Sequence, residues 1–555
     1  MSIKTIARSL ALVAGFSIAV ANAAAYDIPA AVDATAKAQI TAGVLAAPIR
    51  YLASDALEGR GPATRGDTLA RLYLATELEA LGYQPAGTDK FQQEFEVVGT
   101  TAKLPPTWSF TTKTGNVDLK LKDDYIAGSG VQTETAGFDN AELVFVGYGI
   151  EAPEYKWDDF KGVDVKGKVL VMLNNDPDWD DKLFAGKTRL YYGRWTYKYE
   201  SAARHGAAGV ILVHTTDSAG YPWQVVQSSW GGEQFELPAE GEPRIQLKGW
   251  GTEDSVKRLL KAGGFDLDSL VKSAHQRTFK PVKLGIKTSI HFDNKVSRVR
   301  TGNVAGILPG SDPKLKDEVV IYSAHHDHFG IGQPDAKGDK IYNGAEDNAA
   351  GCAQLLGIAR AFAALPERPR RSVMILFVAG EEQGLLGSRY YSLHPTVKAG
   401  KIAANINYDG GNFRGRTRDL AQIGKGKSSI DAIAKAMLER QHRVVIDDAF
   451  PDKGYFYRSD QFNFAKIGVP ALYFHGGIDY IGKPEGWGRH EQEEWVEHIY
   501  HQPSDEIDDT WVFDGMIEDA SVGFFTGWLI AQADQMPVWN KGDEFEAARL
   551  KSLAD

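Results

Sequence analysis

The stretch Ser372-Val-Met-Ile-Leu-Phe-Val-Ala-Gly-Glu-Glu382 decides the fold class of this chain. Its first part is an almost unbroken apolar run, which is typical of a strand buried on both faces of a sheet. Similar strands are expected at 304–308, 318–323 and 402–408, and helices at 348–364 and 384–392. This alternation predicts an α/β domain with a mostly parallel central sheet that helices sandwich on both faces.

Residues suited to metal chemistry follow three of these strands. His325 and Asp327 come after strand 318–323, and Asp409 comes after strand 402–408. In a parallel sheet the carboxyl ends of the strands meet at one edge, where binding sites form. An imidazole can bind a metal through one nitrogen while a nearby carboxylate accepts the proton of the other nitrogen. We therefore predict His325 as a metal ligand and Asp327 as the residue that orients it.

Glu381 and Glu382 directly follow strand 372–378. Adjacent carboxylates at a buried strand end repel each other unless a counter-charge is present, and two metal ions would supply that charge. One glutamate can then bind metal while its neighbour takes a proton from water. We assign Glu382 as the ligand and Glu381 as the general base.

Two further residues are needed to complete such a site. Asp347 lies at a loop-to-helix junction and could bridge two cations, although its position alone fits a helix N-cap better. His501 lies in a loop whose backbone Pro503 restrains, and it would complete the shell of the second metal. On composition alone, His490 and His498 compete with His501.

Five segments together resemble the co-catalytic zinc aminopeptidases, a family that includes glutamate carboxypeptidase-type enzymes and glutaminyl cyclases. The segments are Ser-Ala-His-His-Asp-His at 323–328, Gly-Ala-Glu-Asp-Asn-Ala-Ala-Gly at 344–351, Ala-Gly-Glu-Glu-Gln-Gly at 379–384, Asn-Tyr-Asp at 407–409 and Tyr-His-Gln-Pro-Ser-Asp at 500–505. The resemblance covers residues 43–125 and 290–535, approximately. Ser459-Asp-Gln461 also matches a recurring segment, in which the family often has His in place of Gln461.

The resemblance implies two zinc ions per chain and a role for each matched residue. His325 and Asp409 would bind one zinc, Glu382 and His501 the other, and Asp347 both. Because no ligand position is lost, a catalytically dead relative and the one-zinc cyclases are disfavoured. Tyr500, beside His501, would either donate to the oxyanion of the reaction or pack against the ligand loop.

The favoured function is a secreted zinc-dependent exopeptidase, an aminopeptidase that hydrolyses the N-terminal peptide bond through a water shared by two zinc ions. One alternative is a carboxypeptidase or dipeptidase of the same fold, which would need basic residues aimed at a substrate carboxylate. Candidates for that role are Arg414, Arg416, Arg458 and Arg489. Another alternative is a catalytically idle protein that binds a peptide or a partner.

Between about residues 125 and 285 the sequence changes to short β-rich runs separated by turns. Its segments Gly-Tyr-Gly-Ile at 147–150, Asp-Val-Lys-Gly-Lys-Val at 164–169 and Ala-Arg-His-Gly-Ala-Ala-Gly-Val at 203–210 resemble the protease-associated domain inserted into many secreted peptidases. We expect a signal peptide at 1–23, the first part of the peptidase domain at 24–125, the β-rich protease-associated α/β domain at 126–288 and the zinc peptidase domain at 289–555. The inserted domain would serve as a lid or as a stability or assembly module.

The composition limits the partners of the chain. Its 555 residues carry a net charge of −11 and no polybasic stretch, which argues against nucleic acid or anionic lipid as a partner. A peptide substrate is expected, and the sequence leaves the oligomeric state open. The single cysteine, Cys352, excludes an internal disulfide and lies in a segment typical of a buried helix.

The N-terminus has the pattern of a secretory signal peptide. Lys4 and Arg8 precede an apolar run from Leu10 to Val20, and Ala21-Asn-Ala23 fits a cleavage site. The apolar run is shorter than the roughly 18–20 residues that a transmembrane helix needs. We therefore expect no membrane span, and export to a periplasm or to the medium.

Overall fold

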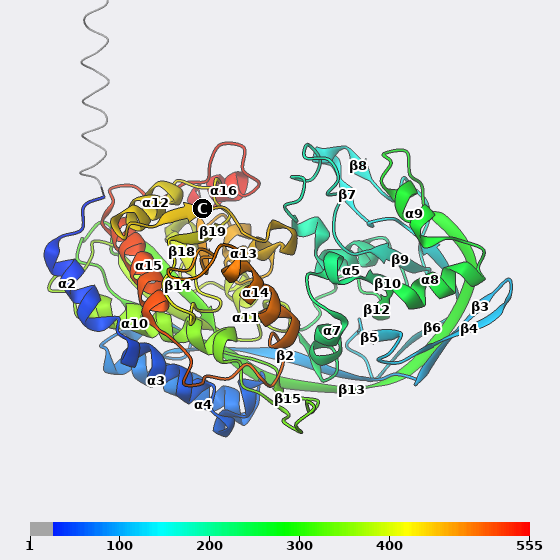
Figure 1. Cartoon of the computed structure of the whole chain (residues 1–555), viewed down its shortest axis with the longest axis horizontal. Coiled ribbons are helices and arrows are strands. Elements are labelled where there is room, and N and C mark those ends of the chain that lie inside the picture. The colour runs from blue at the N-terminus through cyan, green and yellow to red at the C-terminus, as the bar shows by residue number, and fades with distance from the viewer. Residues whose placement is uncertain (1–25, 555) are drawn as a thin grey trace, which may run out of the picture.

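The computed structural model describes residues 26–554, and the expected signal peptide at 1–23 lies outside this range. The described chain forms two lobes (Figure 1). The first lobe, on the left of the figure, holds the N-terminal helices and the C-terminal half of the chain. The second lobe, on the right, contains the short strands and helices between β3 and α9. In the described residues, no helix is long and apolar enough to cross a bilayer.

The first lobe is built on a mixed, mostly parallel sheet, which confirms the predicted fold class. Four neighbouring strands run parallel in the order β17 (Ser372–Val378), β14 (Val319–His325), β18 (Ile402–Asn407) and β21 (Ala471–His475). The end of β13 (Val282–Leu308) lies antiparallel beside β17, and β19 (Asp419–Ile423) lies antiparallel beside β21 and pairs with β20 (Val444–Ile446).

Helices cover both faces of this sheet because successive residues of each strand point to opposite sides. On β14, Val320 and Tyr322 pack into the core formed with α10, whereas Val319 and Ile321 pack with Tyr391 of α11 on the other face. The helices of this lobe are α2 (Ala30–Gln39), α3 (Ala42–Leu52), α4 (Arg65–Ala80), α10 (Gly351–Ala363), α11 (Leu386–Leu393), α12 (Ile430–Arg440), α13 (Gln461–Lys466), α14 (Trp487–His498), α15 (Asp514–Gln532) and α16 (Glu546–Ala554).

The second lobe has its own sheet and its own cores. The parallel neighbours β6 (Thr135–Phe145), β9 (Val169–Leu173), β10 (Gly209–His214) and β12 (Leu247–Thr252) are flanked by antiparallel β5 (Tyr125–Ser129) and β13. Its other helices and strands include β3 (Thr107–Thr112), β4 (Gly115–Lys120), β7 (Glu151–Ala152), β8 (Trp157–Asp158), α5 (Trp195–Arg204), α6 (Thr216–Ala219), α7 (Trp223–Ser229), α8 (Glu253–Ala262) and α9 (Leu267–Ala274). Trp108 and Phe110 belong to the same core as Phe145, so this core also takes in residues before 126.

One long strand joins the two lobes. β13 pairs with β6 in the second lobe and with β17 in the first, and Figure 1 shows it running along the lower side of the second lobe toward the first. β2 (Gln92–Lys103) follows it in antiparallel register from Asp293–Lys103 to Val304–Gln92, and β11 (Gln234–Glu236) pairs with β2. The boundary between the lobes is therefore bridged by continuous backbone hydrogen bonding.

Candidate metal centre

The predicted ligands gather at the carboxyl edge of the first lobe's sheet. His325 is the last residue of β14, and its Nε2 lies 3.2 Å from Asp347 Oδ1 and 3.4 Å from Asp409 Oδ1. Asp409 follows the end of β18, as expected from its position after a buried strand. We call His325 and Asp409 the His325 half-site.

A second group of donors lies on the other side of Asp347. His501 Nε2 is 3.1 Å from Glu382 Oε2 and 3.4 Å from Asp347 Oδ2. We call His501 and Glu382 the His501 half-site. Each oxygen of Asp347 therefore faces one half-site, which is the arrangement a carboxylate needs in order to bridge two cations.

The donor atoms of both half-sites suit a metal ion. His325 Nε2 and His501 Nε2 are buried, and apart from the carboxylates of the cluster they have no hydrogen-bond partner among residues 26–554. Buried polar atoms are rarely left without a partner, so these orphaned atoms indicate a cation. Imidazole and carboxylate groups are donors that Zn²⁺ accepts.

Charges in the cluster shift the pKa values of its members strongly. Burial alone would lower the pKa of His501, but Glu382 and Asp347 raise it to about 9. Burial and Asp347 act to raise the pKa of Glu382, yet His501 and His328 hold it at about 2. The Glu382 carboxylate is thus stabilised in its charged form by nearby positive charge, which a bound cation would also supply.

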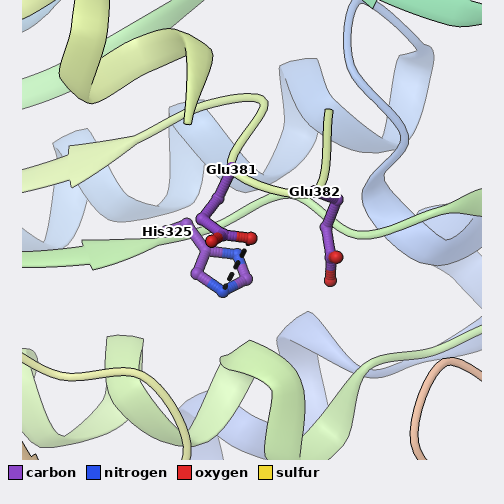
Figure 2. A group of neighbouring side chains, drawn as sticks. All are labelled: His325, Glu381 and Glu382. Carbon is purple, nitrogen blue, oxygen red and sulfur yellow. Dashed lines mark ion pairs between the residues drawn. The ribbon is translucent and has the colours of Figure 1, made fainter. Parts of the chain in front are cut away.

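Glu381 lies beside the His325 half-site. Its Oε2 is 3.9 Å from His325 Nε2, and Figure 2 shows the two side chains facing each other while Glu382 projects from the next position of the same loop. Burial, together with the charges of Asp409 and Glu382, raises the pKa of Glu381 well above its ordinary value. Such a carboxyl group is adapted to accept and release a proton.

Asp327 contacts both predicted functional loops. His325 Nδ1 lies 3.2 Å from the backbone oxygen of Asp327 and 3.8 Å from its carboxylate Oδ1. The same Oδ1 accepts a hydrogen bond from the backbone N–H of Glu381 at 3.1 Å. The nearest acceptor for the imidazole proton is therefore the backbone, while the carboxylate holds the loop that carries Glu381.

Asp347 lies in a short π-helical turn, Ala345–Ala350, which leads directly into α10 and in which Asp347 has non-helical φ and ψ angles. Asn348 Oδ1 accepts from the backbone N–H groups of Gly351 and Gly410, and Asp505 Oδ2 accepts from the N–H of Asp347 at 3.0 Å. α10 therefore begins at Gly351 rather than at 348, where the helix was expected. Ala350 occupies the N-cap position of α10, so the alternative role of Asp347 as a helix N-cap is wrong.

Sequence reasoning assigned no role to three other buried residues around the site. Arg60 is fully buried, and its guanidinium donates to the backbone oxygens of Leu52, His326, Asn343 and Gly344. His328 Nδ1 lies 2.6 Å from Glu382 Oε1, so His328 is a further possible donor for the His501 half-site. Asp460 is fully buried, and neither of its carboxylate oxygens has a hydrogen-bond partner within 26–554.

The competing histidines do not join the cluster. His498 lies on α14 with Glu494, and both side chains are more than half exposed. His490 lies in the exposed part of the same helix. Of the three candidates for this ligand, the structure brings only His501 to the other donors.

A cleft of about 210 Å³ opens beside the cluster, between the two lobes. Glu381, Tyr500 and Arg458 line it from the first lobe, and Arg194 lines it from the second. Arg458 Nη2 donates to the Tyr500 hydroxyl oxygen at 3.0 Å. The phenol thus receives a hydrogen bond and keeps its own O–H available to donate into the cleft.

The sequence of this region matches the profile of Peptidase family M28 over residues 303–517. This segment, which makes up less than half of the chain, is similar to peptidase family M28. It contains His325, Asp347, Glu381, Glu382, Asp409 and His501.

Curated proteins with related sequences include peptidases. Aminopeptidase NAALADL1 of Rattus norvegicus is 28% identical over 242 residues, which cover 35% of this chain and 30% of the rat protein. A probable zinc metalloprotease of Pyricularia oryzae is 36% identical over 106 residues, which cover 19% of each chain. The chain thus matches under one third of the length of these relatives.

The fold also resembles a solved structure over nearly its whole length. An aminopeptidase from Aneurinibacillus sp. strain AM-1 superposes with a TM-score of 0.54 at 19% sequence identity, covering 91% of this chain and 96% of that chain. At this identity the likeness concerns the fold. It includes the second lobe as well as the M28 segment.

Proposed function

We propose that this chain is a zinc-dependent exopeptidase, specifically an aminopeptidase that uses two zinc ions. The main support is the pair of half-sites on either side of Asp347, because the buried Nε2 atoms of His325 and His501 have no hydrogen-bond partner in the described chain other than the carboxylates of the cluster. The match of the segment 303–517 to peptidase family M28 supports hydrolysis of a peptide bond. The rat relative that bears the name aminopeptidase supports action at the N-terminus.

His325 and Asp409 would hold one zinc ion, His501 and Glu382 the other, and Asp347 would bridge them. When bound, zinc supplies Lewis acidity, which polarises a scissile carbonyl and makes water more acidic. Side chains of the protein would transfer the proton and stabilise the oxyanion.

Glu381 would move the proton. Its carboxylate lies within 3.9 Å of His325 Nε2 and lines the cleft, so it is placed to take a proton from the attacking water. As the C–N bond breaks, the same carboxyl group would return the proton to the leaving amine. Asp327 supports this role, because its carboxylate accepts a hydrogen bond from the backbone N–H of Glu381 and so fixes the position of that residue.

Tyr500 would donate to the oxyanion that develops on the former carbonyl oxygen. Burial raises the pKa of Tyr500 well above its ordinary value, against the opposing effect of Arg458, so the phenol keeps its proton and can donate into the cleft while Arg458 donates to its oxygen. Tyr500 also stacks on the ring of His501 with centroids 3.7 Å apart, so its position is tied to that of the proposed ligand.

The variant Glu381→Gln tests the proposed role of the base. It removes the proton acceptor but keeps the size and polarity of the side chain. We expect the variant to bind zinc as the wild type does and to lose about 10²–10⁴-fold in kcat, the range attributed to general acid–base catalysis. Wild-type turnover with normal zinc content would refute the assignment of Glu381.

A carboxypeptidase or dipeptidase is the second candidate function, and one observation favours it. Arg194 and Arg458 line the cleft and form no ion pair with a carboxylate among the described residues. A panel of aminoacyl anilides and N-blocked peptides separates the two functions. Hydrolysis of the anilides supports the aminopeptidase, whereas activity restricted to peptides with a free C-terminal carboxylate would overturn it.

Two further parts of the proposal concern the rest of the chain. Export is supported by Lys4 and Arg8 before the apolar run, which lie outside the described residues. We also propose that the second lobe corresponds to a protease-associated domain, with boundaries near 126 and 288. Its alternating β-strands and helices and its own core support that division.

A further inference from the structure

The second lobe contacts the loop that carries His501. α7 faces α14 across the boundary between the lobes, as Figure 1 shows, and Gln224 Nε2 donates to the backbone oxygen of Glu497 at 2.9 Å. Val496 and Tyr500 pack against the core of the second lobe that contains Val225 and Val226. The loop after α14 is therefore held from both lobes.

One contact reaches the proposed ligand itself. The hydroxyl oxygen of Ser229, the last residue of α7, lies 3.1 Å from His501 Nδ1. A histidine that binds a metal through Nε2 carries its proton on Nδ1, and an oxygen at that position fixes both the tautomer and the orientation of the ring. His501 Nε2 is directed to Glu382 and Asp347 and has no hydrogen-bond partner in the described chain.

The backbone of His501 shows that its position depends on its surroundings. Its φ angle is +58°, in the left-handed region that non-glycine residues rarely adopt. Such a conformation persists when neighbouring contacts determine it. Ser229 is one of those contacts and comes from a different lobe.

A separate contact reaches the other residue of the His501 half-site. The backbone N–H of Phe235 donates to Gln383 Oε1 at 2.9 Å, and Gln383 directly follows Glu382. Phe235 lies in β11, which is fixed to the sheet by its pairing with β2. The loops of both His501 and Glu382 are thus attached to the segment 223–236.

The His325 half-site is held differently. The Nδ1 atom of His325 faces the backbone oxygen of Asp327, and the backbone oxygen of Asp409 accepts a hydrogen bond from the Tyr473 hydroxyl at 3.1 Å. Both of these partners belong to the first lobe. The two half-sites therefore differ in their dependence on the second lobe.

We infer that the second lobe is a structural part of one metal half-site, and that Ser229 is a positioning residue that orients His501 for metal binding. This inference rests on the metal ligands proposed above. It predicts that a change at Ser229 weakens the binding of one of the two zinc ions and leaves the affinity for the other unchanged.

The test compares the full-length wild type with three variants in α7. Ser229→Ala removes the hydroxyl, and Ser229→Thr keeps it. Ser228→Ala is the matched control, because the hydroxyl of Ser228 donates to the backbone oxygen of Val225 at 3.1 Å. Each protein is stripped of metal and titrated with Zn²⁺ against a chromophoric chelator. Cobalt(II) titration followed by visible absorption gives a second readout that does not depend on activity.

We expect the wild type, Ser228→Ala and Ser229→Thr to bind two equivalents of zinc with the same affinities. Ser229→Ala should bind one equivalent normally and the other about 10–100-fold more weakly, as found for residues that orient metal-bound histidines. Equal affinities in Ser229→Ala and the wild type would overturn the inference, as would equal weakening of both equivalents. A Ser229→Thr variant as weak as Ser229→Ala would also overturn it. A wild type that binds fewer than two equivalents would instead refute the proposed metal count.

Discussion

Replacement of Arg60 should destabilise the fold around the metal centre more than any substitution on the surface. The guanidinium of Arg60 is fully buried and donates to four backbone oxygens, those of Leu52, His326, Asn343 and Gly344. His326 and Gly344 lie in the two loops that carry His325 and Asp347. Arg60 therefore ties the N-terminal part of the lobe to both loops.

The expected cost follows from these contacts. A hydrogen bond to a charged group contributes about 1.5–3 kcal/mol, so Arg60→Met should lower the free energy of unfolding by roughly 6 kcal/mol or more. This approaches the roughly 5–15 kcal/mol that stabilises a whole domain. Arg60→Lys keeps the charge but loses the planar fork, and the loss of one or two hydrogen bonds should cost about 2–5 kcal/mol.

Urea unfolding followed by tryptophan fluorescence measures this difference. The control is Arg65→Met, because Arg65 is exposed in the first turn of α4 and makes no side-chain hydrogen bond or ion pair within the described range. The control should stay within about 0.5 kcal/mol of the wild type. If Arg60→Met folds and its free energy of unfolding lies within about 1 kcal/mol of the wild-type value, roughly the contribution of one ordinary hydrogen bond, the reasoning is refuted.

Three other predictions concern the site and the second lobe. Tyr500→Phe should lower kcat by about 10²–10³-fold with little change in KM, because it removes a donor to the oxyanion, and unchanged kcat would exclude that role. Removal of zinc with a chelator should lower the Tm, because zinc at about 1,000 times its Kd stabilises the folded state by about 4 kcal/mol. Addition of zinc should restore the Tm. A Tm that does not respond to zinc would contradict a metal site in the folded state. Burial lowers the pKa of His214 to about 4, so the unfolded chain binds a proton at higher pH than the folded chain does. Protonation of His214 in the unfolded chain should therefore lower the free energy of unfolding of the wild type by up to about 3 kcal/mol as the pH falls from about 6.5 to about 4. Urea unfolding at these two pH values should show a smaller decrease for His214→Gln than for the wild type. Equal decreases in the two proteins would argue against this role of His214.

The sequence was sufficient to predict the residues whose positions depend on strand ends. His325, Glu381, Glu382 and Asp409 follow buried strands, and parallel neighbours bring those ends together. The strand expected at 372–378 agrees with β17, because its apolar run has no competing pattern. The metal-binding roles themselves stay predictions until zinc is measured.

The residues that support the site could not be predicted in the same way. Arg60 is 266 residues away from His326 in the chain, and Ser229 is 272 residues away from His501. No local periodicity records such contacts, and a single arginine or serine is common in any sequence. The start of α10 was misplaced for a related reason, because Asn348 binds the backbone of Tyr408 and Gly410, which the local pattern does not contain.

The uninterrupted course of β13 bears on how substrates reach the cleft. Two domains joined by a flexible linker can swing apart, but here a swing would break the ladder between β13 and β2 where it crosses from one lobe to the other. The lobes should move mainly by gentle twisting of this two-stranded ribbon, so the width of the opening stays nearly constant. We therefore expect the molecule to sort polypeptides by thickness, admitting a thin chain end more readily than a folded segment.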